Sequence, residues 1–102
     1  MEAESTLFPL GRLIVTAGAD AVLTEAGEEA DRFLSRHVLG DWGEASAARH
    51  AANELALAIR KPLISTYRTS TGRMLLVITD PVRSTTHILL PEEKRPPHQR
   101  RK

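Results

Sequence analysis

The stretch LISTYRTSTGRMLLVITD, residues 63–80, places two apolar segments on either side of a short polar turn. Gly72 supplies the positive φ that a tight turn between strands often needs. The run Met74–Ile78 is the most continuously apolar part of the chain, which is typical of a strand covered on both faces. We therefore predict strand, turn and strand here, with the second strand at the centre of a sheet.

Two further strands are predicted outside this hairpin. Downstream of a turn at Asp80 and Pro81, the segment Ser84–Leu90 has strand character and stops at Pro91. Upstream, Leu10–Thr16 has the β-branched content and the length of a strand. Its apolar residues occupy both odd and even positions, as expected for a strand covered on both faces.

Three helices are predicted between the first strand and the hairpin. The first is capped by Thr16 and ends at Gly27, the second runs from Glu28 to Leu39, and the third begins after Ser46 and stops before Pro62. Each carries one apolar stripe that we expect to face the sheet. The stripes are Ala19, Val22, Leu23 and Ala26; Ala30, Phe33, Leu34 and Val38; and Ala48, Ala52, Leu55 and Ile59.

This order predicts an α+β domain with one N-terminal strand, three helices and a three-stranded antiparallel meander, the helices packing on one sheet. We place a flexible N-terminus at residues 1–7, a single domain at 8–91 and a disordered basic tail at 92–102.

Composition limits the classes of function. The chain is 41% apolar and 26% charged, as in a globular protein, and it has no cysteine for disulfides, zinc-thiolate sites or thiol catalysis. No apolar run approaches the roughly 20 residues of a membrane span, and the start lacks the pattern of a signal peptide. The cytoplasm is the expected location, without membrane association.

The net charge of +1 depends on the basic residues from Lys94 onward. The chain before Lys94, which we call the body, is acidic. Five of the 14 basic residues follow the last acidic one. The remaining chain has nine basic and 13 acidic residues, which gives a net charge of −4. Only the tail therefore suits weak phosphate contact. Its basic residues are Lys94, Arg95, Arg100, Arg101 and Lys102.

No catalytic, cofactor or metal site is predicted. The glycines form no nucleotide-binding pattern, and the histidines have no partner at metal-ligand spacing. His37 lies on the second helix's apolar stripe, which favours a core role. His87 would face away from Ser84 and Thr86 along a strand, which disfavours a role as their general base.

Polar residues at two places are candidate partner-binding sites. Arg83, Ser84 and Thr86 could receive a phosphate or carboxylate, although turn chemistry and strand propensity also explain them. Tyr67 and Arg68, on the neighbouring strand, could lie near that site. The second place is an acidic cluster at a helix start, which could meet a basic partner or simply be solvated: Glu28, Glu29 and Asp31.

The only tryptophan lies in GDWG, residues 40–43. Asp41 and Glu44 have the spacing of a capping box that would start a helical segment at Trp42, after Gly40 ends the second helix. We interpret Trp42, Asp41, Gly40 and Gly43 as structural, with the indole buried between the second and third helices and its N–H bound to a backbone acceptor.

Several motifs together resemble a group of short bacterial proteins encoded on plasmids, prophages and other mobile elements. GDWG and the pattern RSxxxxLLPEE at 83–93 are the most specific, and the resemblance spans about residues 8–93. The other motifs are FPLG at 8–11, TAG at 16–18, AxN at 51–53, the segment around Tyr67 and VIT at 77–79.

The chain departs from that group at four positions. Ala17 stands where proline is usual, Val82 replaces an acid, His87 replaces a threonine and Lys94 replaces an aromatic. Without the acid at position 82, an Asp-Arg-Ser site is not expected to be inherited. The group has almost no known biochemistry, so the resemblance implies a genomic setting rather than an activity.

These observations favour a non-enzymatic accessory protein of a phage or mobile element that binds another protein, with a host defence nuclease of the CRISPR or restriction type as the candidate partner. An acidic body could present carboxylates to such a nucleic-acid-binding partner. Two alternatives stay open: a toxin endoribonuclease like RelE, which has a similar element order, and nucleic-acid binding through the basic tail.

Overall fold

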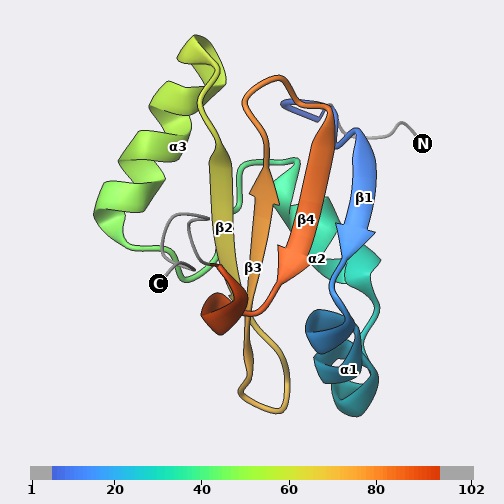
Figure 1. Cartoon of the computed structure of the whole chain (residues 1–102). Coiled ribbons are helices and arrows are strands. Elements are labelled where there is room, and N and C mark those ends of the chain that lie inside the picture. Colours follow the sequence, from blue (N-terminus) through green and yellow to red (C-terminus); the bar gives the residue numbers. More distant parts are fainter. Residues whose placement is uncertain (1–5, 95–102) are drawn as a thin grey trace, which may run out of the picture.

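The computed structural model describes residues 6–94 and contains one four-stranded sheet in the order β1-β4-β3-β2 (Figure 1). Strands β2, β3 and β4 form an antiparallel meander, whereas β1 lies parallel to β4 at the edge. The α+β class is confirmed, but the sheet is mixed. The strands are β1 (Arg12–Val15), β2 (Leu63–Arg68), β3 (Met74–Thr79) and β4 (Thr85–Leu89).

Helices α1 (Ala17–Ala26) and α2 (Ala30–His37) cover one face of the sheet, and α3 (Ala47–Ile59) lies beside β2 (Figure 1). Local capping explains where α1 and α3 start. Thr16 and Ser46 each accept a hydrogen bond from the main-chain N–H three residues ahead. Helix α1 ends at Gly27 in the left-handed conformation. None of the helices in the described part of the chain has the length and apolarity needed to cross a lipid bilayer.

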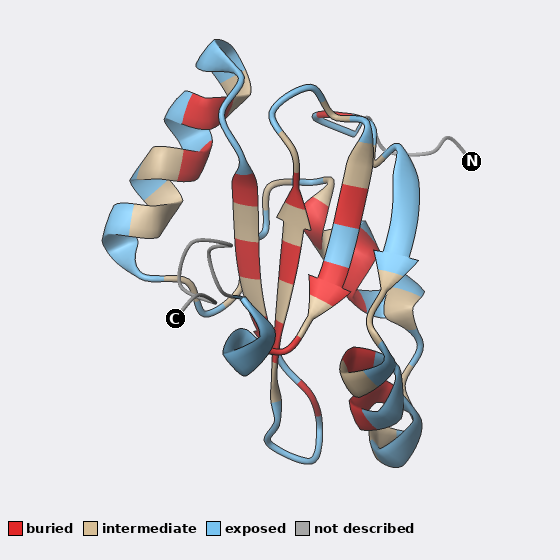
Figure 2. Cartoon of the chain, in the orientation of Figure 1, coloured by how far each residue is buried: buried red, intermediate tan, exposed pale blue. Residues whose placement is uncertain are grey.

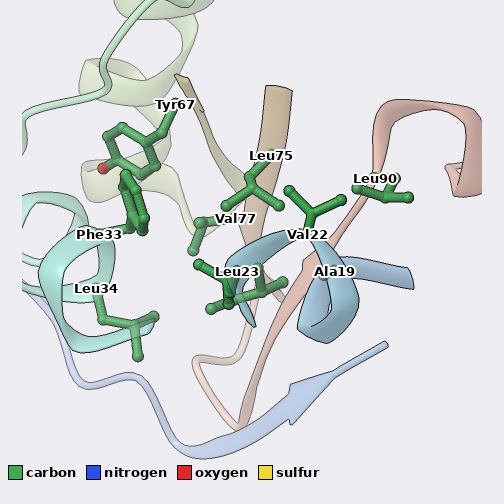
Figure 3. Packing of buried hydrophobic residues seen from close by; sticks show 10 residues of the cluster. Ala19, Val22, Leu23, Phe33, Leu34, Tyr67, Leu75, Val77 and Leu90 are labelled. Carbon is green, nitrogen blue, oxygen red and sulfur yellow. The ribbon is translucent and has the colours of Figure 1, made fainter. Parts of the chain in front are cut away.

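The main core lies between the sheet and helices α1 and α2 and is mostly aliphatic. Figure 3 shows side chains of both helices directed at Leu75 and Val77 of β3. Phe33 packs on Tyr67 with ring centroids 5.4 Å apart. The central position predicted for the apolar run 74–78 is confirmed, because β3 lies between β2 and β4.

The prediction for the first strand is wrong in two respects. Strand β1 is shorter than Leu10–Thr16, and it is exposed rather than covered: Leu13 and Ile14 keep 41% and 39% of their surface accessible. It lies at the sheet edge with β4 as its neighbour, and a crossover containing three helices connects it to β2 at the opposite edge.

The predicted orientation of the third helix is also wrong. The face of α3 that is buried carries Asn53 and Ala56, whereas Leu55 and Ile59 remain 58% and 49% exposed. The Asn53 side-chain amide donates to the Ile64 carbonyl at 2.8 Å and accepts from the Ile64 N–H at 3.1 Å. This double contact holds α3 against the edge of β2.

GDWG forms a turn rather than the predicted helix start. Asp41 accepts a hydrogen bond from the Gly43 N–H, and the Glu44 N–H donates to the Thr66 carbonyl, so the capping box does not form. The Trp42 indole is 1% exposed, and its N–H donates at 3.0 Å to the Glu54 carboxylate rather than to a backbone group. The local chain pairs with β2 instead of beginning a helix.

A buried polar network lies beneath α2. The two ring nitrogens of His37 contact the hydroxyls of Ser65 at 2.6 Å and Thr79 at 2.9 Å, and the Thr79 hydroxyl contacts that of Thr86 at 2.8 Å. The Thr86 hydroxyl also donates to the Leu10 carbonyl. All four side chains are fully buried, so the network compensates for their loss of hydration.

The described chain ends in a 3-10 turn at Pro91–Glu93, which includes two residues that the sequence assigned to the tail. The Glu93 carboxylate accepts hydrogen bonds from the Thr16 hydroxyl and the Leu90 N–H. This turn therefore attaches to the start of α1. Residues 95–102 of the predicted tail lie outside the described residues, as do residues 1–5 of the predicted N-terminal segment.

We predict that the protein loses stability between pH 7 and pH 5. Burial, assisted by the positive charge of Arg83, lowers the pKa of His37 from 6.5 to about 4. The unfolded chain therefore binds a proton below about pH 6.5, while the folded chain stays unprotonated there. Urea unfolding should show a loss of about 2 kcal/mol at pH 5 relative to pH 7.

The control is His37→Gln, which should be less stable than wild type at pH 7 but should lack most of this pH dependence. Equal stability of the wild-type protein at the two pH values would show that His37 is not held neutral by the fold.

We also predict that Gly43→Ala destabilises the fold far more than Gly72→Ala. Both glycines have positive φ, but a Cβ at Gly43 would lie 2.1 Å from the Thr66 carbonyl oxygen, whereas one at Gly72 would meet nothing within 4 Å. The free energy of unfolding should fall by about 3 kcal/mol for Gly43→Ala and about 1 kcal/mol for Gly72→Ala. Similar losses in urea unfolding would contradict the close approach.

Candidate binding surface

The face of the sheet opposite α1 and α2 is open in the described structure, with only the 3-10 turn at its lower end (Figure 2). We call it the outer face. Cross-strand register places Ile14, His87, Ile78 and Ile64 in one row across all four strands. Other apolar residues of this face are Met74, Leu76 and Leu89, which are half-buried like Ile64 and Ile78, whereas Ile14 is exposed. An apolar sheet face of this kind normally packs against another element or another molecule.

Helix α3 forms a wall along this face. A hollow of about 310 Å³ lies between α3 and β2 and has Leu55, Ile59 and Ile64 in its lining. We call it the α3 groove. Ile64 also belongs to the outer face, so the groove and the sheet surface are continuous. The remaining lining residues are Arg49, Ala52, Lys61 and Pro62.

The charges around the α3 groove are basic. Arg49 and Lys61 line it, and neither side chain makes an ion pair within residues 6–94. By contrast, Asp20, Glu28 and Glu29 line a separate hollow between α1 and α2, near the edge of β1. The acidic groups of the body are therefore not spread evenly, and this surface suits a partner with acidic groups beside apolar ones.

The predicted anion site around Arg83 is occupied by the protein itself. The Arg83 guanidinium donates to the carbonyls of Ala56, Lys61 and Asp80 at 2.7–2.9 Å, which joins α3 to the β3–β4 turn. The Ser84 hydroxyl donates to the Asp80 carboxylate at 2.6 Å. Thr86 is buried in the polar network with His37. These contacts give the segment a structural role.

The sequence suggested that Tyr67 and Arg68 lie near Arg83, but the structure places them elsewhere. Antiparallel pairing puts them opposite Leu75 and Met74, at the end of the sheet far from the β3–β4 turn. Tyr67 is buried and donates to the Asp41 carbonyl at 2.6 Å, and burial raises its pKa to about 12. The Arg68 guanidinium pairs with the Glu44 carboxylate at 3.1 Å.

The acidic cluster at the start of α2 is divided. The Glu28 carboxylate accepts a hydrogen bond from the Ser70 N–H and lies 3.7 Å from Arg32, so it supports the β2–β3 turn. Glu29 and Asp31 are exposed. Only these two remain available to a partner.

One pair of side chains has the spacing of a catalytic pair. Ser65 and His37 are spaced like a nucleophile and its base, but both are fully buried, so a substrate cannot approach them. Both phenylalanines, Tyr67 and Trp42 are buried as well, so within residues 6–94 the ring that the outer face offers for base stacking is the imidazole of His87. Within residues 6–94, no group of three potential metal ligands is found.

The spacing of apolar residues did not predict this surface, because α3 has two faces with apolar residues and either could pack against the sheet. One contains Ala52, Leu55 and Ile59, and the other contains Ala56 and Leu57. The informative signal is Asn53, a polar residue followed at helical spacing by the apolar Ala56 and Leu57. An amide at that place can pair with the edge of a strand, which turns the opposite stripe outward.

Comparison of the chain with protein-family models, with curated proteins and with solved structures gave no match.

Proposed function

We propose that the protein is a non-enzymatic accessory protein that binds another protein through the outer face and the α3 groove. The observation that carries this proposal is an apolar surface beside helix α3 that no other element of residues 6–94 covers. Leu55 and Ile59 give it exposed anchors, and Ile64 and Ile78 extend it across the sheet.

The partner that fits best presents an amphipathic helix with acidic residues beside its apolar stripe. The groove between α3 and β2 can receive apolar anchors, and Arg49 and Lys61 stand at its border to meet carboxylates. The Arg83 guanidinium is engaged by carbonyls of the protein itself, so Arg49 and Lys61 are the cations that would meet the acidic groups of the partner.

The resemblance to mobile-element proteins provides the biological setting of this proposal. It favours an anti-defence role in which the bound protein is a host defence nuclease of the CRISPR or restriction type. The outer face supports the binding part of this proposal, and the sequence resemblance supports the setting. The acidic groups expected to face the partner lie mainly elsewhere, around the hollow between α1 and α2.

We predict that Leu55→Asp abolishes partner binding without unfolding the protein. Leu55 is 58% exposed, so its loss removes little core packing, but a carboxylate in the groove would repel an acidic partner. In affinity capture from a bacterial host lysate, the amount of the retained partner should fall at least about tenfold. The matched control is Val82→Asp, at a residue 66% exposed in the β3–β4 turn, which should retain it.

A second pair of variants tests the charge preference. Arg49→Glu should weaken capture, whereas Arg73→Glu, at the far end of the sheet, should not. Stoichiometric capture of no protein, or equal capture by wild type and Leu55→Asp, would contradict binding through this surface.

A further inference from the structure

The free edge of β1 presents main-chain groups without a partner. The N–H groups of Arg12 and Thr16 donate to Ser84 and Ile88 of the β4 segment. Main-chain groups alternate in direction along a strand, so those of Leu13 and Val15 point away from β4. Among residues 6–94, nothing forms a hydrogen bond with them.

At the opposite edge of the sheet, main-chain groups have hydrogen-bond partners within the protein. Along β2, the Asn53 amide satisfies both main-chain groups of Ile64, and Thr66 pairs with the turn at Trp42 and Glu44. One edge is therefore closed by the protein itself, whereas the other remains available for pairing.

We infer that β1 pairs antiparallel with β1 of a second copy about a twofold axis at Ile14. This register places Leu13 opposite Val15 of the second copy, so their N–H and C=O groups exchange hydrogen bonds reciprocally. It joins the two four-stranded sheets into one continuous sheet, with both outer faces on the same side. The inference goes beyond the proposed function, because it uses a different surface.

The side chains on the inner side of β1 suit this pairing. Leu13 is 41% exposed although it lies on the same side of the sheet as the buried Thr86. In the second copy it would lie next to Val15, which borders a hollow of about 410 Å³ whose lining includes Leu23 and Ala30. The hollow can receive the leucine that β1 leaves exposed.

The outer side supplies an apolar pair and a charge pair. Ile14 would face Ile14 of the second copy, and cross-strand β-branched pairs of this kind are favourable. Arg12 is exposed and has no ion pair in the described chain. It would lie opposite Thr16 of the second copy, whose hydroxyl contacts the Glu93 carboxylate at 2.7 Å. The guanidinium and that carboxylate are complementary in charge.

The first test is sedimentation of the full chain over a range from about 1 µM to about 500 µM, because a short strand pair gives a weak interface. We expect a doubling of the 11.3 kDa monomer mass as concentration rises. Leu13→Pro removes one outward N–H, and Ile14→Lys places like charges at the axis; each should weaken the dimer at least about tenfold. Val82→Lys, also an exposed apolar residue, should dimerise like wild type.

The second test uses the absence of cysteine from the chain. Facing residues of such a pair have Cβ atoms about 4.5–5.5 Å apart, close to the separation that a disulfide spans. Ile14→Cys should therefore form a covalent dimer under mild oxidation, whereas Val82→Cys should do so far more slowly.

A wild-type chain that stays monomeric at the highest concentration would overturn the inference. So would a dimer that persists in both Leu13→Pro and Ile14→Lys, or equal crosslinking of the two cysteine variants. Partner capture by the α3 groove is measured with Leu55→Asp, so failure of either idea leaves the other testable.

Discussion

The contact between Asn53 and the main chain of Ile64 determines how the rest of the surface is arranged. One side chain supplies both the donor and the acceptor that the edge of β2 lacks, at 2.8 and 3.1 Å. A helix held in this way lies beside the sheet rather than across it. As a result, the apolar stripe containing Leu55 and Ile59 is exposed, and α3 does not cover the outer face of the sheet.

The same end of the molecule depends on polar contacts within a mainly aliphatic core. His37, Ser65, Thr79 and Thr86 satisfy one another beneath α2, and Arg83 joins α3 to the β3–β4 turn through three carbonyls. Buried polar groups are costly when they are unpaired, so this set specifies one arrangement of helix and strands. This set includes Arg83 and Thr86, which were predicted from the sequence to belong to a candidate anion site.

The two proposed surfaces follow from a difference between the sheet edges: α3 and the turn at Trp42 pair with β2, whereas no segment of residues 6–94 pairs with the free edge of β1. Closing the β2 edge with α3 creates a groove with basic borders, which suits an acidic amphipathic helix. The open β1 edge suits another strand, and an identical copy brings Leu13, Ile14 and Arg12 to complementary positions. Both proposals concern contacts with other protein chains, and both depend on which groups the fold leaves unpaired at the sheet edges.

Local signals in the sequence were sufficient for the class of fold and most elements. Thr16 and Ser46 cap helices where predicted, Gly27 ends α1, and the apolar run at 74–78 is an inner strand, because each depends on neighbours within a few residues. For the candidate surface, the sequence provided the exposed apolar residues but assigned them to the core.

By itself, the sequence determined an α+β domain with its helices and strands in order, since capping and apolar periodicity act over one or two turns. Tertiary structure alone decided that β1 is a parallel edge strand, that Trp42 binds Glu54, and which stripe of α3 is buried. Each of these features depends on a few contacts between residues that are distant in the chain. The periodicity of apolar residues would be the same for the alternative arrangements, so it does not distinguish them. The open surface is therefore a property of packing.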